Sequence, residues 1–273
     1  MSTTTASVTS PAAAPVVATL PRGAAWTDGL TIARRNLLRI LRTPQLVFFS
    51  TIQPIMFVLL FNYVFGGALV PGGGDKYIDY LLPGIMVQTV AFGATSTAIG
   101  LATDMGTGII DRFRSLPMAR SAVLSGRTSA DAVRNLFVVV LMVVVGTVIG
   151  FRFHNGALLA VASVLLAVLF GFAFSWVFAF IGLKTGDAET AQLAGFAIIF
   201  PLVFASSAFV PTASMPGWLQ AFADHQPVTA TANAIRHLSQ GGDIASPLTQ
   251  SLLWIAAIIA VFAPLAVARY RKG

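Results

Sequence analysis

The feature that most constrains this chain is a series of long apolar runs that contain no charged residue. A run of about 17–25 apolar residues can cross a membrane as a helix. We therefore predict an all-α polytopic membrane protein, with residues 26–273 as one domain and six transmembrane helices, at about 46–65, 81–103, 135–151, 157–183, 191–210 and 247–268. The composition agrees, because charged residues make up 10% of the chain against about a quarter in soluble proteins.

The N-terminal part divides into two segments. Residues 1–25 are rich in Ser, Thr, Ala and Pro and lack the basic start of a signal peptide, so we predict a disordered cytoplasmic tail. Residues 26–45 form an amphipathic pattern whose arginines lie largely outside the apolar face, which suits a helix lying in the membrane interface among lipid headgroups. The alternative is a soluble amphipathic helix packed on a core. The arginines of this inner interfacial helix are Arg34, Arg35, Arg39 and Arg42.

The positions of the basic residues predict the orientation. Six spans place both termini on one side, and fourteen of the seventeen Lys and Arg residues then fall on that side. Only Lys76, Arg152 and Arg236 fall on the other side. By the positive-inside rule both termini are cytoplasmic. The net charge of +7 is thereby explained by topology, and we expect no nucleic-acid partner.

A short basic segment, Asp104–Arg120, separates the second and third predicted spans. Its apolar residues recur at helical spacing between Gly108 and Pro117, which predicts a helix of about two turns. An isolated helix of this length is marginal in water, so another surface must cover its apolar side. The segment is either a docking helix for a cytoplasmic partner or a solvated loop held by its neighbours.

A second structured segment lies on the outer side, between the fifth and sixth spans. Trp218, Leu219 and Phe222 share one helical face, and a further short helix is expected over Asn233–Leu238, before Gly241. Aromatic residues of this kind favour the headgroup level of a membrane. The two helices either cap a pathway through the membrane or anchor the protein at its surface.

Several chemistries are missing from the sequence. The predicted spans contain no Asp, Glu, Lys, Arg or His, which weighs against a proton-coupled carrier, although hydroxyl-bearing residues such as Thr89 and Ser96 leave sodium coupling open. The nearest approach to a nucleotide-binding P-loop, SAVLSGRT at 121–128, has Ser for the first Gly and Arg for the Lys. We expect no catalytic residue, bound cofactor or metal in this chain.

Two stretches resemble a known family. GIIDRFRSLPMARSAVLSGR (108–127) and MPGWLQAFADHQPVTATANAIR (215–236) are similar to the permease subunit of type-2 ABC exporters, in the daunorubicin-resistance-type branch of actinobacteria. The resemblance covers roughly Trp26–Tyr270. It implies a subunit of a bacterial cytoplasmic membrane that pairs with a second permease, the same chain or a sibling, and with two cytoplasmic ATPase subunits. ATP and Mg²⁺ would bind to the ATPase.

The resemblance also implies roles for particular residues. The segment 108–117 would be the coupling helix that contacts the ATPase, through Asp111, Arg112, Phe113, Arg114, Ser115, Leu116 and Pro117. The outer segment would form re-entrant helices, which include Met215, Pro216, Trp218, Phe222, Pro227 and Arg236. The substrate does not carry over, because this branch contains drug, antibiotic and lipid exporters.

The sequence thus leads to one hypothesis and two alternatives. The hypothesis is a permease subunit, without enzymatic activity of its own, that contacts membrane lipids and exports a hydrophobic or amphipathic compound across the cytoplasmic membrane. A separate ATPase supplies the energy. The first alternative is a self-sufficient secondary transporter or channel. The second is a non-transporting membrane anchor for a cytoplasmic factor.

Overall fold

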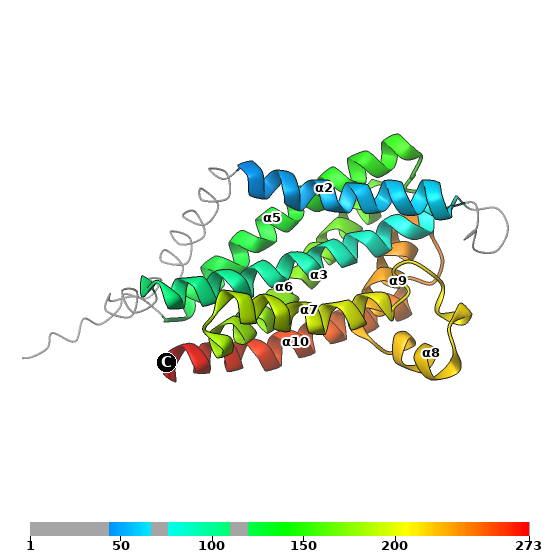
Figure 1. Cartoon of the computed structure of the whole chain (residues 1–273). Coiled ribbons are helices and arrows are strands. Elements are labelled where there is room, and N and C mark those ends of the chain that lie inside the picture. Colours follow the sequence, from blue (N-terminus) through cyan, green and yellow to red (C-terminus); the bar gives the residue numbers. More distant parts are fainter. Residues whose placement is uncertain (1–43, 67–75, 110–119, 273) are drawn as a thin grey trace, which may run out of the picture.

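The computed structural model describes residues 44–66, 76–109 and 120–272, and the regular elements within these ranges are all helical. Helices α8 and α9 lie at one end of the bundle and the C-terminal end of α10 at the other (Figure 1). In chain order the elements are α2 (Pro44–Leu60), the π-helical turn η1 (Phe61–Phe65), α3 (Tyr77–Gly106), α5 (Arg120–Ile149), α6 (Gly156–Thr185), α7 (Ala188–Phe204), the 3-10 turn η2 (Thr212–Ser214), α8 (Gly217–Asp224), α9 (Pro227–Gln240) and α10 (Ala245–Lys272).

The long helices have the dimensions of membrane spans. By length and composition, four described helices can cross a membrane: Tyr77–Gly106, Val123–Ile149, Gly156–Thr185 and Ala245–Arg271. Two shorter apolar helices, Thr51–Val64 and Ala188–Phe204, accompany them. The predicted all-helical membrane class is therefore confirmed, while the count of six spans stays a prediction.

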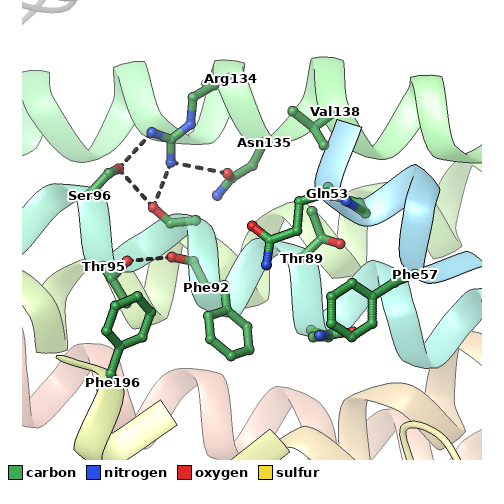
Figure 2. Close-up of a pocket in the computed structure, with 13 residues that line it drawn as sticks. Gln53, Phe57, Thr89, Phe92, Thr95, Ser96, Arg134, Asn135, Val138 and Phe196 are labelled. Carbon is green, nitrogen blue, oxygen red and sulfur yellow. Dashed lines mark hydrogen bonds between the residues drawn. The ribbon is translucent and has the colours of Figure 1, made fainter. Parts of the chain in front are cut away.

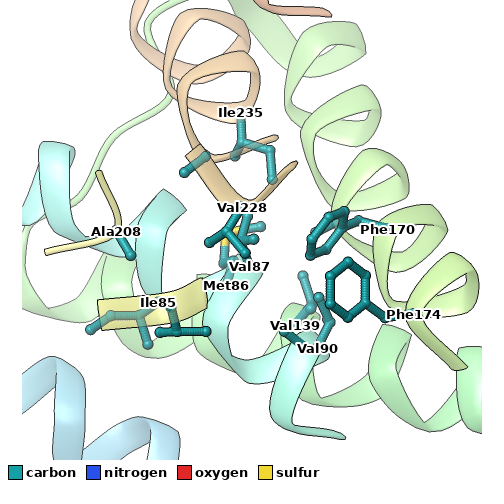
Figure 3. Close-up of a cluster of buried hydrophobic side chains, with 14 of the residues drawn as sticks. Ile85, Met86, Val87, Val90, Val139, Phe170, Phe174, Ala208, Val228 and Ile235 are labelled. Atoms are coloured by element: carbon teal, nitrogen blue, oxygen red, sulfur yellow. The ribbon is translucent and has the colours of Figure 1, made fainter. Parts of the chain in front are cut away.

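Helix α3 forms the centre of the bundle. In its most apolar 18-residue stretch, 67% of the residues are buried inside the protein, against 28% in the corresponding stretch of α5 and 22% in that of α10. It packs on α2, α5, α6, α7 and α9, and Figure 3 shows its residues Ile85 to Val90 among side chains of α5, α6 and α9. A helix that is apolar around its whole circumference is expected in such a position.

Small residues allow the closest contacts of α3. A Cβ atom at Gly84 would overlap the backbone carbonyl of Ala208, and one at Gly182 of α6 would overlap the carbonyl of Ala98. Backbones can approach this closely only where no side chain intervenes. Helix α3 is thereby fixed against α6 and against the non-helical segment 205–210.

Polar caps define both ends of α7. The carboxylate of Asp187 accepts a hydrogen bond from the backbone N–H of Thr190 at 2.8 Å, which is a standard N-cap and lowers the pKa of Asp187. At the other end, the Gln226 amide donates to the carbonyls of Leu202 (2.7 Å) and Ala205 (3.0 Å) and also caps α9. The amide of Gln226 therefore joins the end of α7 to the start of α9.

Several helix boundaries differ from the sequence prediction. Helix α3 begins at Tyr77 rather than 81, α7 ends at Phe204 rather than 210, and α5 begins at Arg120 rather than 135. The last difference corrects an expectation, because Arg127, Asp131 and Arg134 lie within the candidate span Val123–Ile149. The prediction that the spans carry no charged residue is wrong for α5 at this length: Arg127 pairs with Asp104 of α3, whereas Arg134 pairs with Asp131 of α5 itself.

Candidate functional site

The residues predicted for ATPase contact and for the interfacial helix lie outside the described residues. This applies to the coupling residues 111–117 and to the four arginines at 34, 35, 39 and 42. The residues predicted for the outer segment, 215–236, are described. The site is therefore built from these residues and from the polar groups within the bundle.

The outer segment divides into an exposed helix and a buried one. Helix α8 follows Met215 and Pro216, and its Trp218 and Phe222 side chains are 76% and 47% exposed. Helix α9 begins at the buried Pro227 and buries most of its residues against the bundle. Helix α9, unlike α8, is thus part of the packed core.

Arg236 holds α9 in this position. Its Nε donates to the Tyr80 carbonyl at 2.9 Å, its Nη1 to the Ser207 hydroxyl (3.0 Å) and the Asn233 side chain (2.7 Å), and its Nη2 to the carbonyls of Ser207 and Ala208. The guanidinium carbon also lies 3.7 Å from the centre of the Tyr80 ring. We call Arg236, Tyr80, Ser207, Ala208 and Asn233 the Arg236 knot.

The Arg236 knot satisfies a buried charge with neutral groups only. Arginine has five N–H donors in a fixed fork, and the described partners give each of them an acceptor. Within the described residues no carboxylate lies in ion-pair range of Arg236. Because this charge has left water, its burial lowers the pKa of Arg236. The knot joins the start of α3, the end of α9 and segment 205–210.

A different polar network joins α3 to α5. Arg127 Nη1 donates to Asp104 Oδ2 at 2.7 Å, and Thr97 Oγ1 donates to Asp131 Oδ2 at 2.5 Å. Arg134 Nη1 lies 3.5 Å from Asp131 Oδ1, and Arg134 donates further bonds to Ser96 Oγ (2.6 Å) and the Gly93 carbonyl (2.7 Å). We call the residues Ser96, Thr97, Asp104, Arg127, Asp131 and Arg134 the α3–α5 ladder.

The α3–α5 ladder ends in the middle of the bundle. Arg134 is the fifteenth of thirty residues in α5, and its acceptor Gly93 is the seventeenth of thirty in α3. The neighbouring Asn135 lies against Gly93 of α3 and Gly171 of α6, where a Cβ atom would come within 2.8 Å and 2.7 Å of its amide. A charged group at this depth of a membrane helix is costly and is typically paired or functional.

A pocket of about 240 Å³ opens at this end of the ladder, between α2, α3, α5 and α7. Figure 2 shows Arg134 and Asn135 on one side of this mid-helix pocket and Phe57, Phe92 and Phe196 on the other. Two buried polar atoms of its lining, Gln88 Oε1 and Asn135 Nδ2, have no hydrogen-bond partner in the described part of the chain. Such atoms favour a ligand or water that completes their bonding.

Aromatic rings continue from the mid-helix pocket toward the α9 end of the bundle. The ring centres of Phe92 and Phe200 are 5.3 Å apart. The Phe200 ring stacks on the Phe204 ring with 5.5 Å between their centres, and the centres of Phe204 and Phe209 are 5.4 Å apart. Phe200 and Phe204 are each nearly half exposed. We call these four rings the aromatic track.

The α3–α5 ladder was not predicted, although the sequence carries a signal for it. Arg127, Asp131, Arg134 and Asn135 follow the spacing i, i+4, i+7, i+8 of one helix face. On the opposite face the apolar residues Val133, Phe137, Val140 and Val144 are exposed in the bundle. A helix with polar groups facing protein and apolar groups facing outward is arranged for lipid surroundings.

Comparison with known proteins assigns the chain to a class of membrane transport proteins. Residues 28–238 match the ABC-2 type transporter family, and the chain belongs to this family. It is 34% identical over 251 residues to the daunorubicin resistance ABC transporter permease protein DrrB1 of Streptomyces coeruleorubidus. The matched residues cover 92% of this chain and 88% of that protein.

More distant relatives carry similar descriptions. The probable doxorubicin resistance ABC transporter permease protein DrrC of Mycobacterium tuberculosis is 32% identical, over 88% of this chain and 86% of that protein. The putative transport permease ycf38 of Cyanophora paradoxa is 26% identical, over 76% of this chain and 72% of that protein. The chain is therefore an ABC exporter permease subunit, an integral membrane protein whose family implies an ATPase partner and permease pairing.

Proposed function

We propose that this permease exports a hydrophobic or amphipathic compound across the bacterial cytoplasmic membrane, and that a cytoplasmic ATPase drives the export through the coupling helix at 108–117. Family membership over residues 28–238 carries the proposal. Relatives described as resistance permeases for daunorubicin and doxorubicin support a drug, antibiotic or lipid-like cargo. The complete exporter would contain two ATPase subunits, which bind ATP and Mg²⁺, and a second permease.

The proposed topology has six spans with both termini cytoplasmic, residues 26–273 as one transmembrane domain, and α8 and α9 as re-entrant helices on the outer side. The apolar helices and the distribution of basic residues support it. The chain has no cysteine, so single cysteines can report the side of each segment. Cysteine at Ser115 should be shielded from an impermeant external reagent, and cysteine at the exposed Trp218 should react.

The mid-helix pocket is the proposed contact site for the exported compound. Its three phenylalanine rings offer an apolar surface, and the side chains of Gln53, Thr89 and Arg134 offer a polar one. An amphipathic molecule would satisfy both. The aromatic track then provides an apolar surface along which such a molecule could move toward the α9 end of the bundle.

Export measurements with the cognate ATPase test this proposal. Phe113→Ala, or Arg112→Glu together with Arg114→Glu, should leave the permease inserted but reduce ATPase co-purification and export, because aromatic and arginine residues are typical interface hot spots. Robust gradients driven by protons or sodium in vesicles without any ATPase would instead establish a secondary transporter.

The pocket has its own test. Phe92→Ala removes a ring that lines the pocket and contacts Phe196 and Phe200, and should lower export with ATPase binding unchanged. The matched control is Phe137→Ala, which removes a ring from the exposed face of α5. Equal export by the two variants would contradict the assignment of the pocket.

A further inference from the structure

We propose that the α3–α5 ladder passes movement from the connection between α3 and α5 to the mid-helix pocket, with Arg134 as the positioning residue at the pocket. This inference rests on the proposed function, since it assumes that the ATPase acts on residues 108–117. Those residues join the end of α3 to the start of α5. Any displacement there therefore acts on both helices at once.

The polar bonds between α3 and α5 lie in one half of the two helices. They begin with Arg127–Asp104 near the end of α3 and finish with Arg134 on Ser96 and Gly93 halfway along both helices. Beyond this point the contact is largely apolar, as where Gly146 of α5 faces the Leu82 side chain. The directional bonds thus cover the part of α3 and α5 between residues 108–117 and the pocket.

These bonds are stiff. Ion pairs and charge-assisted hydrogen bonds are short, directional and stronger away from water. Asp104 and Asp131 are nearly buried, so sliding α3 along α5 would leave a carboxylate without its donors, at considerable cost. The two helices are therefore expected to move together in this half of the bundle.

Arg134 has a double role. Its guanidinium bonds both helices, through Asp131 on α5 and Ser96 and Gly93 on α3, and it also lines the pocket. Asn135 beside it has a free Nδ2 atom. A shift of α5 relative to α2 and α7 would move both groups against the remaining pocket wall. Arg134 would then set the shape and polarity that a cargo molecule meets.

A reporter in the pocket tests the inference without requiring a known cargo. An environment-sensitive fluorophore on cysteine at Gln53, an exposed residue of the pocket lining, is read in the permease–ATPase complex before and after addition of a non-hydrolysable ATP analogue. With the ladder intact we expect a spectral change. In Arg127→Asp, which faces Asp104 with a like charge, the change should fall about fivefold or more, a fold-change typical of coupling between sites.

Three further variants separate coupling from folding. Arg127→Asp with Asp104→Arg should recover most of the response, and Asp131→Asn, which keeps the side-chain shape, should reduce it at normal protein levels. Arg152→Asp is the matched control, because Arg152 lies outside the ladder and bonds the carbonyls of Thr147 and Phe151. A full response in Arg127→Asp and Asp131→Asn, with ATPase bound, would overturn the inference and leave the proposed function standing. Failure of the wild-type permease to bind the ATPase would refute the proposed function itself.

Discussion

The Arg236 knot and the α3–α5 ladder bury arginines in opposite ways. Arg236 is held by backbone carbonyls, a hydroxyl, an amide and one aromatic ring, whereas Arg127 and Arg134 are held mainly by carboxylates and hydroxyls on facing helices. Carbonyls of a packed segment cannot change partners without backbone movement. Side-chain bonds between two helices hold these helices together, while the pair can still move against the rest of the bundle. The knot is therefore suited to a fixed joint, and the ladder to a part that transmits motion.

The glycines beside the two networks show the same difference. A Cβ atom at Gly84 would overlap the backbone of Ala208 in the knot, whereas a Cβ atom at Gly100 would overlap only the guanidinium of Arg127. A backbone atom in a packed region cannot move away, but the end of an arginine side chain can. The close contact at the α9 end is thus fixed by the main chain, and the close contact at the ladder by a side chain.

The largest effect is expected from Arg236→Lys. An ammonium group offers three donors from one point and cannot replace a five-donor fork, so carbonyls of Tyr80, Ser207 and Ala208 would lose donors inside the protein. Disrupting a buried charged network typically costs roughly 3–5 kcal/mol. Thermal unfolding of the detergent-solubilised permease measures the loss. Wild-type stability in Arg236→Lys would show that the knot is not the fixed joint described above.

The second prediction compares the two glycines. Gly84→Ala should lower stability by about 1–3 kcal/mol through overpacking, because the Ala208 carbonyl cannot retreat. Gly100→Ala should lower stability less than Gly84→Ala, because only the end of the Arg127 side chain must move and the better helix propensity of alanine, about 1 kcal/mol, offsets part of the lost Arg127–Asp104 pairing. The Gly100 variant should instead weaken the response of the pocket reporter. Equal thermal losses in the two variants would erase the distinction between the regions.

A third, smaller effect is expected in the ladder from Thr97→Val. Valine has nearly the same shape but cannot donate to Asp131, which is 7% exposed. A hydrogen bond to a charged group contributes about 1.5–3 kcal/mol, and we expect the lower end because Asp131 keeps Arg134. Thr103→Val is the matched control, since among the described residues its hydroxyl bonds only the Ile99 carbonyl of its own helix. Both variants are compared by thermal unfolding at one detergent concentration.

The sequence allowed the fold class to be predicted but gave the wrong limits for the helices near charged residues. Apolar runs identified the α6 and α10 spans closely, because residues 157–183 and 247–268 of these helices carry no charged side chain. Helix α5 was predicted to begin at 135, fifteen residues too late, since a charge was taken as the end of a span. The charges of Arg127 and Arg134 are tolerated because partners on α3 meet them, and such partners are visible only once the helices are packed.

Prediction of the site met the same limit. Arg236 was singled out from its motif, yet its burial depends on carbonyls of Ser207 and Ala208 that no side-chain pattern encodes. The mid-helix pocket combines four helices that are distant in sequence, so periodicity on any one of them could not reveal it. The roles of residues 111–117 stay predictions, because they lie outside the described residues.

The smallest effect is expected from Tyr80→Phe, and it tests how redundant the Arg236 knot is. The Tyr80 hydroxyl donates to the Ser207 carbonyl at 2.9 Å, which also accepts from Arg236 Nη2. Removing it leaves that carbonyl bonded and keeps the ring beneath the guanidinium, so the loss should stay near the lower end of the usual 0.5–1.5 kcal/mol for a neutral hydrogen bond.

Tyr77→Phe is the matched comparison. The Tyr77 hydroxyl donates to the Phe209 carbonyl at 2.9 Å, and within the described residues no second donor reaches that carbonyl. The Tyr77 variant should therefore lose more stability than the Tyr80 variant when both are unfolded thermally.

In an Arg236→Lys background, Tyr80→Phe should become as costly as Tyr77→Phe, because the Ser207 carbonyl then loses both donors. An unchanged effect of Tyr80→Phe in that background would mean that the fork of Arg236 does not share this acceptor, and that the joint depends on the tyrosines instead.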